Sequence, residues 1–365
     1  MEIYLIGLAV ALVGGLLMSR LTRLLHLPAV TAYLVAGLLL GPFFLGRLNV
    51  PGLGFNTLEE VNVLSIVSQT ALGFIAFAMG NEFRLSQLRT IGSRAIIIGI
   101  LQAVITTIVV DVILLLLHLF FPHIISVPCA ITLGAIAAAT APAATLMVVR
   151  QYKADGPMTR LLMLVVALDD AVGLLLFSVS FGIATALSNG QVSVLAVVVE
   201  PIVEILLSVG LGGFMGLLLH WVERFFHSRS KRMSLSVAFV MLTVGLSMLE
   251  FQIGPVHCGF SLLLVCMMTG TIFCNVCPTS EELMERVDGW TMPLNILFFV
   301  ISGAELDLNV LSQPVTLIVG IIYIIARSAG KYCGANLSCR ITKEPKSIVD
   351  HLGITLLPQA GVALG

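Results

Sequence analysis

Long apolar runs, separated by short polar segments, make up most of the chain. A run of about 20 apolar residues is long enough to cross the hydrocarbon core of a bilayer as an α-helix, and the pattern predicts twelve such spans. We expect them at residues 2–19, 28–45, 61–80, 95–120, 127–149, 158–187, 196–222, 233–249, 257–277, 290–306, 314–339 and 350–365. The last run is still apolar at Gly365, so we expect its helix to be truncated there and a further helix to come after it. The pattern therefore predicts an all-α polytopic membrane protein.

The composition supports a membrane protein and excludes several other classes. Apolar residues make up 58% of the chain and charged residues 11%, whereas a soluble domain carries about 25% charged residues. The net charge is −1, and no basic cluster is large enough to follow a phosphate backbone, which argues against a nucleic-acid partner. With a mean hydropathy of +1.07, the expected surroundings are membrane lipids, and a water-soluble enzyme is excluded.

Lysine and arginine residues are distributed unequally between the two alternating sets of connections. Sixteen of the nineteen fall in one set, the other set holds only Arg47, and the remaining two, Arg327 and Lys331, lie inside a span. Positively charged connections stay on the cytoplasmic side of a membrane. The distribution therefore predicts that the N-terminus lies outside the cytoplasm.

Two adjacent aspartates, Asp169 and Asp170, lie in the middle of an apolar span. A charge at the bilayer centre costs at least about 2.5–3.5 kcal/mol, so such groups are candidates for function. Neighbouring residues on a helix point about 100° apart, so one carboxylate can face a fixed partner while the other faces a water-filled cavity. Two carboxylates this close titrate as a coupled system, which suits a site that exchanges protons for a cation. A purely structural ion pair is less favoured, because one aspartate would suffice.

Two spans contain a proline where a helix would have to break. Pro142 removes a backbone donor and frees the carbonyl near Ala138, and the small residues around Thr140 and Ala141 let another helix approach closely. Pro358 has the same effect in the last span. Paired interrupted helices are typical of a binding site near the bilayer midplane. An ordinary proline kink is the alternative for either helix alone.

The seven cysteines lie within or at the ends of apolar spans. Residues 274–277 have the spacing Cys-x-x-Cys, but there is one such pair and no histidine near it in the sequence, so we interpret the cysteines as small buried side chains. His220 and His227 lie near one helix end; an interfacial position is favoured over a role in sensing pH.

Seven segments in the same order resemble the bacterial monovalent cation/proton antiporters, the family that includes the NapA and NhaA sodium/proton antiporters. They are LPAVTAYLVAGLLLGP (27–42), LGFIAFAMGNEF (72–83), ATAPAATLMVVRQYKADGP (139–157), VALDDAVGLLLF (166–177), LFFVISGAELDL (297–308), ARSAGKYCG (326–334) and LLPQAGVALG (356–365).

The resemblance implies an inverted repeat of five-helix units with two broken crossing helices, divided into a dimerisation panel and a moving core, within a single transporter domain over residues 1–365. On thirteen family helices, the chain would lack the thirteenth and the end of the twelfth. The resemblance also implies a homodimer in the bacterial cytoplasmic membrane, with no cofactor.

Individual residues receive roles from the same resemblance. Asp170 is the expected carboxylate for the proton and for Na⁺, and Asp169 is its neighbour, paired with Lys331. Thr140 is expected to lend its hydroxyl or carbonyl to the ion. The crossing is shaped by Ala139, Ala141, Pro142 and Pro358. Some relatives have an acidic residue where this chain has Ala141. Asp111, Glu82, Glu305 and Arg327 receive no transport role.

These features predict a secondary transporter, not an enzyme, that exchanges Na⁺ or Li⁺ for H⁺ by alternating access. Potassium/proton antiport is the first alternative; potassium-efflux relatives often show Gln-Asp where this chain has Asp169-Asp170, which favours sodium. A sodium-coupled symporter for an organic anion is the second, because related folds support it. An intramembrane aspartyl protease using Asp170 with Asp111 is disfavoured, because neither residue lies in the expected Gly-x-Gly-Asp motif.

Overall fold

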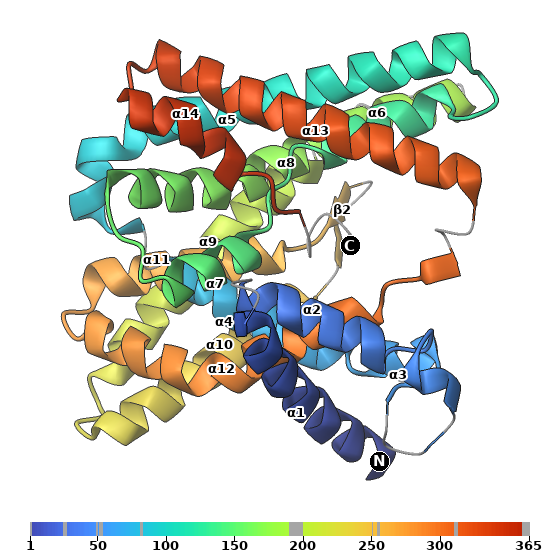
Figure 1. Cartoon of the computed structure of the whole chain (residues 1–365). Helices are drawn as coiled ribbons and strands as arrows, with labels where there is room; N and C mark the ends of the chain where they lie inside the picture. Colours follow the sequence, from blue (N-terminus) through green and yellow to red (C-terminus); the bar gives the residue numbers. More distant parts are fainter. Residues whose placement is uncertain are drawn as a thin grey trace.

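The computed structural model describes residues 2–24, 28–48, 50, 54–80, 83–189, 200–249, 251–253, 256–309 and 313–359. Helices account for most of this part of the chain (Figure 1). The elements in chain order are α1 (Glu2–Leu24), α2 (Ala29–Leu40), the 3₁₀-helix η1 (Leu45–Leu48), α3 (Leu58–Val63), α4 (Ser65–Gly80), α5 (Leu85–Phe120), α6 (Val127–Ile136), α7 (Pro142–Gln151), α8 (Pro157–Asn189), α9 (Glu200–Glu223), α10 (Arg229–Ser247), β1 (Phe251–Ile253), β2 (Val256–Cys258), α11 (Leu262–Val276), α12 (Ser280–Ala304), α13 (Pro314–Ile341) and α14 (Lys346–Thr355).

Several helices have the length and composition of membrane spans. Among the described residues, six segments are long and apolar enough to cross a bilayer: Tyr4–Thr22, Ala29–Leu48, Gly92–Phe120, Ile202–Glu223, Ser280–Ala304 and Pro314–Ile341. Three shorter apolar helices, α4, α6 and α11, accompany them. The helical polytopic fold predicted from the apolar pattern is therefore confirmed.

Two helices begin almost three turns before the apolar run that predicts them. The helix α12 starts at Ser280 instead of residue 290, and α5 starts at Leu85 instead of residue 95. Glu281 and Glu282 occupy the first turn of α12, where carboxylates interact favourably with the helix dipole. Such polar first turns extend a helix into water and carry no apolar signal.

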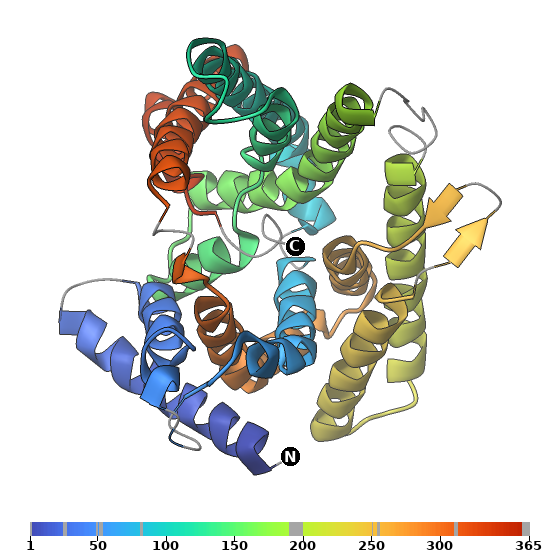
Figure 2. The same ribbon diagram turned by 90° about the vertical axis from the view of Figure 1, so that its right-hand side faces the viewer.

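The expected span at residues 257–277 also begins differently. Residues 257 and 258 belong to β2, which pairs antiparallel with β1 so that Phe251 lies opposite Cys258 (Figure 2). The helix α11 begins only at Leu262. Ser261 caps it, because the Ser261 side chain accepts a hydrogen bond from the amide of Leu264. The sequence Gly-Pro between the two strands is a turn signal, in keeping with their antiparallel pairing.

The helices pack in two groups that both views separate (Figures 1 and 2). One group contains α5, α6, α8, α13 and α14, and the extensive helix contacts within it run between α5 and α13 and between α6 and α8. The other contains α1, α2, α4, α9, α10, α11 and α12. The short helix α7 contacts α8 of the first group and both α2 and α4 of the second. The broken segment between α6 and α7 therefore lies where the two groups meet.

Within the second group, α4 and α11 approach each other so closely that only glycine fits at two positions. A Cβ atom on Gly270 would overlap with the carbonyl oxygen of Phe77, and one on Gly80 would overlap with that of Met267. Helices in membranes use small residues in this way to bring their backbones together.

We expect Gly270→Ala to destabilise the protein by about 1–3 kcal/mol, because the added methyl group meets backbone and not a side chain that can move. The matched control is Gly213→Ala in α9, where a Cβ atom meets nothing within 4 Å. Thermal unfolding of both variants in detergent measures the difference. Equal midpoints for the two variants would contradict the close packing.

Candidate functional site

The two proline-containing segments meet in space. The helix α6 ends at Ile136, and α7 begins at Pro142. On the other side, α14 ends at Thr355, and the described residues 356–359 are not helical. The amide of Ala141 donates a hydrogen bond to the carbonyl of Pro358 at 3.0 Å. The interruptions predicted at the two prolines therefore face each other; the rest of the last predicted span, residues 360–365, lies outside the described residues.

An ion pair between Lys331 of α13 and Asp169 of α8 lies beside this junction. The Nζ atom of Lys331 is 3.0 Å from Oδ2 of Asp169, and both side chains are 0% exposed. Thr140 contributes to the same contact, since its hydroxyl donates to Oδ2 at 2.5 Å and accepts from Nζ at 2.9 Å. The partner that the resemblance implied for Asp169 is therefore present, and a loop residue of the crossing completes the contact.

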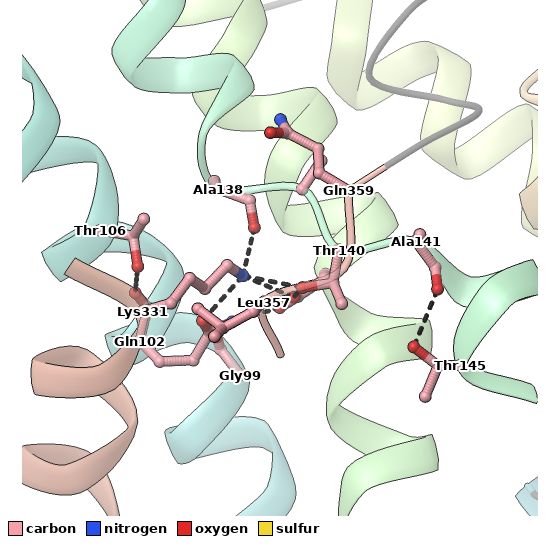
Figure 3. Close-up of polar contacts among 12 residues, drawn as sticks. Gly99, Gln102, Thr106, Ala138, Thr140, Ala141, Thr145, Lys331, Leu357 and Gln359 are labelled. Carbon is pink, nitrogen blue, oxygen red and sulfur yellow. Dashed lines mark hydrogen bonds and ion pairs between the residues drawn. The ribbon is translucent and has the colours of Figure 1, made fainter. Parts of the chain in front are cut away.

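The break in the first crossing supplies a further acceptor for the lysine. The Nζ atom of Lys331 donates to the carbonyl of Ala138 at 2.5 Å (Figure 3). Pro142, four residues later, has no amide hydrogen to give that carbonyl. The proline thus removes a helical hydrogen bond, and the buried ammonium replaces it.

Gln102 of α5 bridges the two charges. Its side-chain amide nitrogen donates to Oδ1 of Asp169, and its side-chain oxygen accepts from Nζ of Lys331 at 2.9 Å. Gln102 is fully buried. The glutamine satisfies a donor of the lysine and an acceptor of the aspartate at once, which lowers the cost of burying the pair. Gln102 was not predicted from the sequence, although it is a polar residue within an apolar run.

Arg327, one turn before Lys331 on α13, ties the two broken segments together. Its guanidinium donates through Nη1 to the carbonyl of Leu357 at 2.5 Å and through Nη2 to the carbonyl of Ala139 at 2.8 Å. These carbonyls belong to the unwound parts of the two crossings. Gln359 adds a second link, because its side chain donates to the carbonyl of Ile136 at 3.0 Å. Arg327 received no role from the sequence, although its spacing from Lys331 places both on one helix face.

We expect Arg327→Ala to lower both stability and exchange rate, because each buried carbonyl left without a donor costs about 1–3 kcal/mol. Arg327→Lys should not restore the loss, since one ammonium lacks the planar fork that reaches two carbonyls. Thermal unfolding in detergent and exchange in liposomes measure the effects. The control is Arg340→Ala at the exposed end of the same helix. A variant Arg327→Ala as stable as this control would contradict the bridging role.

The structure describes the contacts of some of the remaining candidate residues and not of others. Asp170 follows Asp169 in α8, but its side chain lies outside the part of the chain that the structure describes. Thr140 hydrogen-bonds Asp169 and Lys331, so its hydroxyl is part of the ion pair. Asp111 of α5 packs against Gly134 of α6, where its Oδ1 atom has no partner among the described residues. Glu82 lies outside the described residues.

Comparison with known proteins assigns the chain to a family. The family model described as sodium/hydrogen exchanger, transmembrane, matches residues 8–364. The Na⁺/H⁺ antiporter NhaS4 of Synechocystis sp. is 24% identical over 96% of this chain and 83% of its own length. The K⁺ efflux antiporter 5 of Arabidopsis thaliana is 31% identical over 94 residues, which are 26% of this chain and 14% of that protein.

Solved structures agree on the fold. Two structures of the sodium proton antiporter MjNhaP1 from Methanocaldococcus jannaschii are similar to this chain, with TM-scores of 0.66 and 0.74 at 20% and 18% identity. They cover 98% and 96% of this chain, and 84% and 82% of the solved chains. The match to the family model extends over nearly every residue of the twelve predicted spans. The chain therefore belongs to the sodium/hydrogen exchanger family.

Proposed function

We propose that this protein exchanges Na⁺, with Li⁺ as a surrogate, for H⁺ across the bacterial cytoplasmic membrane, and that Asp170 is the carboxylate that carries the cation and the proton. The observation that carries the proposal is the fully buried ion pair of Lys331 with Asp169 at the junction of two broken segments. Ionisable groups are costly inside a membrane and are retained there for transport. The membership of the sodium/hydrogen exchanger family supports the same chemistry.

The contacts of Asp169 suggest how protons and cation are coupled. Asp169 accepts hydrogen bonds from Lys331, Thr140 and Gln102. While Lys331 is charged, the carboxylate of Asp169 is therefore not available to bind the cation. A cation that binds at Asp170 displaces the proton from that carboxylate. Loss of a proton from Lys331 releases Asp169 to help neutralise the cation. Two protons then exchange for one monovalent cation, and each charge moved corresponds to about 2.3 kcal/mol per 100 mV of membrane potential.

Alternating access needs one part of the protein to move against another, and the two groups of helices are suited to these two parts. Asp169, Lys331 and Gln102 all belong to helices of the first group, α8, α13 and α5. We propose that this group is the moving core and that the second group is the panel through which two copies form a homodimer. The distribution of basic residues supports an N-terminus outside the cytoplasm.

Potassium is the second candidate cation. The local similarity to a K⁺ efflux antiporter supports it, but that similarity covers a quarter of the chain, whereas the similarity to NhaS4 covers nearly all of it. The Asp169-Asp170 pair also favours sodium, because potassium-efflux relatives often have Gln-Asp at these two positions.

Proton-coupled transport in liposomes tests the proposal. The protein is reconstituted, the lumen is acidified, and NaCl, LiCl or KCl is added outside while a pH-sensitive dye is followed. We expect dequenching with Na⁺ and Li⁺ and a much weaker response with K⁺. A response to K⁺ alone would show that the transported cation is K⁺ and leave the exchange mechanism unchanged. No response to any cation would overturn the proposal in favour of a symporter.

A further inference from the structure

A second buried polar cluster lies away from the helices that hold Lys331. It consists of His220 and Glu223, one turn apart at the end of α9, and Cys277, which follows the last residue of α11. Their exposed fractions are 8%, 3% and 3%. One nitrogen, one oxygen and one sulfur atom of the three side chains all lie within 4.8 Å of one another. The structure thus brings a histidine to the Cys-x-x-Cys segment, which sequence spacing did not predict.

The carboxylate of Glu223 is held in one orientation. Its Oε1 atom accepts hydrogen bonds from the hydroxyl of Thr279 at 3.0 Å and from Nε of Arg232 at 3.1 Å. Its Oε2 atom lies 3.0 Å from Sγ of Cys277. One oxygen is therefore fixed by two donors, and the other is turned toward the thiol. Metal-ligating carboxylates are commonly oriented by such outer hydrogen bonds.

The imidazole of His220 has one ring nitrogen without a partner. Nη2 of Arg224 lies 2.9 Å from Nε2, and because the guanidinium is always a donor, Nε2 accepts this bond. The Nδ1 atom is buried and has no hydrogen-bond partner among the described residues. An unsatisfied polar atom in a side chain this buried calls for an explanation, such as an ion that the side chain binds.

We propose that His220, Glu223 and Cys277 form a binding site for a divalent soft-to-borderline metal ion of the Zn²⁺ class. Imidazole nitrogen, carboxylate oxygen and thiolate sulfur are the ligands that Zn²⁺ takes in proteins, usually in tetrahedral geometry. Bonds of about 2.3 Å to sulfur and about 2.0 Å to oxygen place those two atoms roughly 3.5 Å apart. The Sγ and Oε2 atoms would therefore separate by a few tenths of an ångström to admit the ion.

The charges and protons of this site balance. Binding removes the thiol proton of Cys277, which leaves to solvent, so that one thiolate and one carboxylate neutralise the dication. The imidazole stays neutral, and its proton moves from Nδ1 to Nε2. Arg224, which is exposed, then turns from Nε2 into water. The bound ion would fasten the end of α9 to the connection between α11 and α12, within the second group of helices.

Metal binding to the purified full-length chain in detergent tests the site. Co²⁺ serves as the probe, because thiolate coordination gives it a charge-transfer absorption band, and elemental analysis counts Zn²⁺ per chain. We expect one metal per chain, a sulfur–cobalt band, and one proton released on binding. Cys277→Ser should abolish the band and His220→Ala should weaken binding at least tenfold. The matched controls, Cys274→Ser in the same Cys-x-x-Cys segment and His227→Ala at an exposed position, should bind as the wild type does.

A third variant distinguishes a specific loss of metal binding from a general loss of folding. Thr279→Val removes the hydrogen bond that the hydroxyl donates to Glu223 and its contact with Sγ of Cys277 at 3.3 Å, and it leaves all three ligands in place. Loss of such an outer partner weakens metal affinity by about 10–100-fold, so we expect weaker Co²⁺ binding with the absorption band retained. A wild-type protein without the band, or a band that Cys277→Ser leaves unchanged, would overturn the proposal. Because no transport is measured, this outcome is independent of the proposed exchange.

Discussion

Replacing Asp170 with Asn abolishes cation/proton exchange and leaves the protein folded. Asparagine has nearly the shape of aspartate but can neither bind a proton on its side chain nor neutralise a cation. Because the proposal gives Asp170 both functions, we expect no dequenching with Na⁺ or Li⁺ at any pH. Asp170→Glu keeps the carboxylate but displaces it by one methylene, so we expect reduced exchange and not complete loss.

The matched control for Asp170 is another aspartate in an apolar helix. Asp111 lies in α5 and makes no hydrogen bond to Lys331 or Asp169 that the structure records. Asp111→Asn should therefore keep exchange close to the wild-type rate in the same liposomes. Normal exchange in Asp170→Asn would show that the transported charge is neutralised elsewhere, and complete loss in both variants would show that the assay reports general damage.

Replacing Lys331 with Met destabilises the protein strongly. The substitution leaves the carboxylate of Asp169 fully buried with its positive partner removed, and breaking a buried ion pair from one side costs about 3–5 kcal/mol. The carbonyl of Ala138 also loses its donor. We expect a clear fall in the midpoint of thermal unfolding in detergent, together with loss of exchange.

A double-mutant cycle separates the ion pair from general packing. Asp169→Asn alone leaves the Lys331 ammonium without its carboxylate, whereas Lys331→Met with Asp169→Asn removes both charges. If the two residues stabilise each other, the double variant is more stable than the sum of the single losses predicts. Simple additivity of the two losses would contradict a direct pair. The double variant should still lack two-proton coupling, because no lysine remains to release a proton.

Much of the fold could be predicted from local sequence patterns, because each of these patterns affects only the helix that contains it. Apolar run length indicated the helices, and Pro142 indicated the break, since a missing amide hydrogen disrupts any helix that contains it. The polar first turn of α12 gave no apolar signal, so the start of that helix was predicted wrongly. The hairpin of β1 and β2 was not predicted, because residues 257 and 258 were assigned to an apolar span.

Contacts between distant residues could be predicted only in part. Gln102 lies 229 residues from Lys331 in the sequence, and nothing in its neighbours marks it as the residue that bridges the pair. Arg327 was recognised as a charge inside a span, but its acceptors are backbone carbonyls of two other segments, and any residue can supply a carbonyl. Such partners depend on how α5, α8 and α13 pack, which periodicity alone does not determine.

The most direct test of the central claim is the release of protons when Na⁺ binds. The claim is that the cation displaces one proton from Asp170 and a second from Lys331, the ion-pair partner of Asp169, so binding without transport must already release protons. Purified protein in weakly buffered detergent solution is mixed with NaCl, and the change in pH is recorded with choline chloride as the control salt. We expect the wild type to release protons on addition of Na⁺ and Asp170→Asn to release none. Equal proton release by the two proteins, or Na⁺ binding to the wild type without any release, would contradict it.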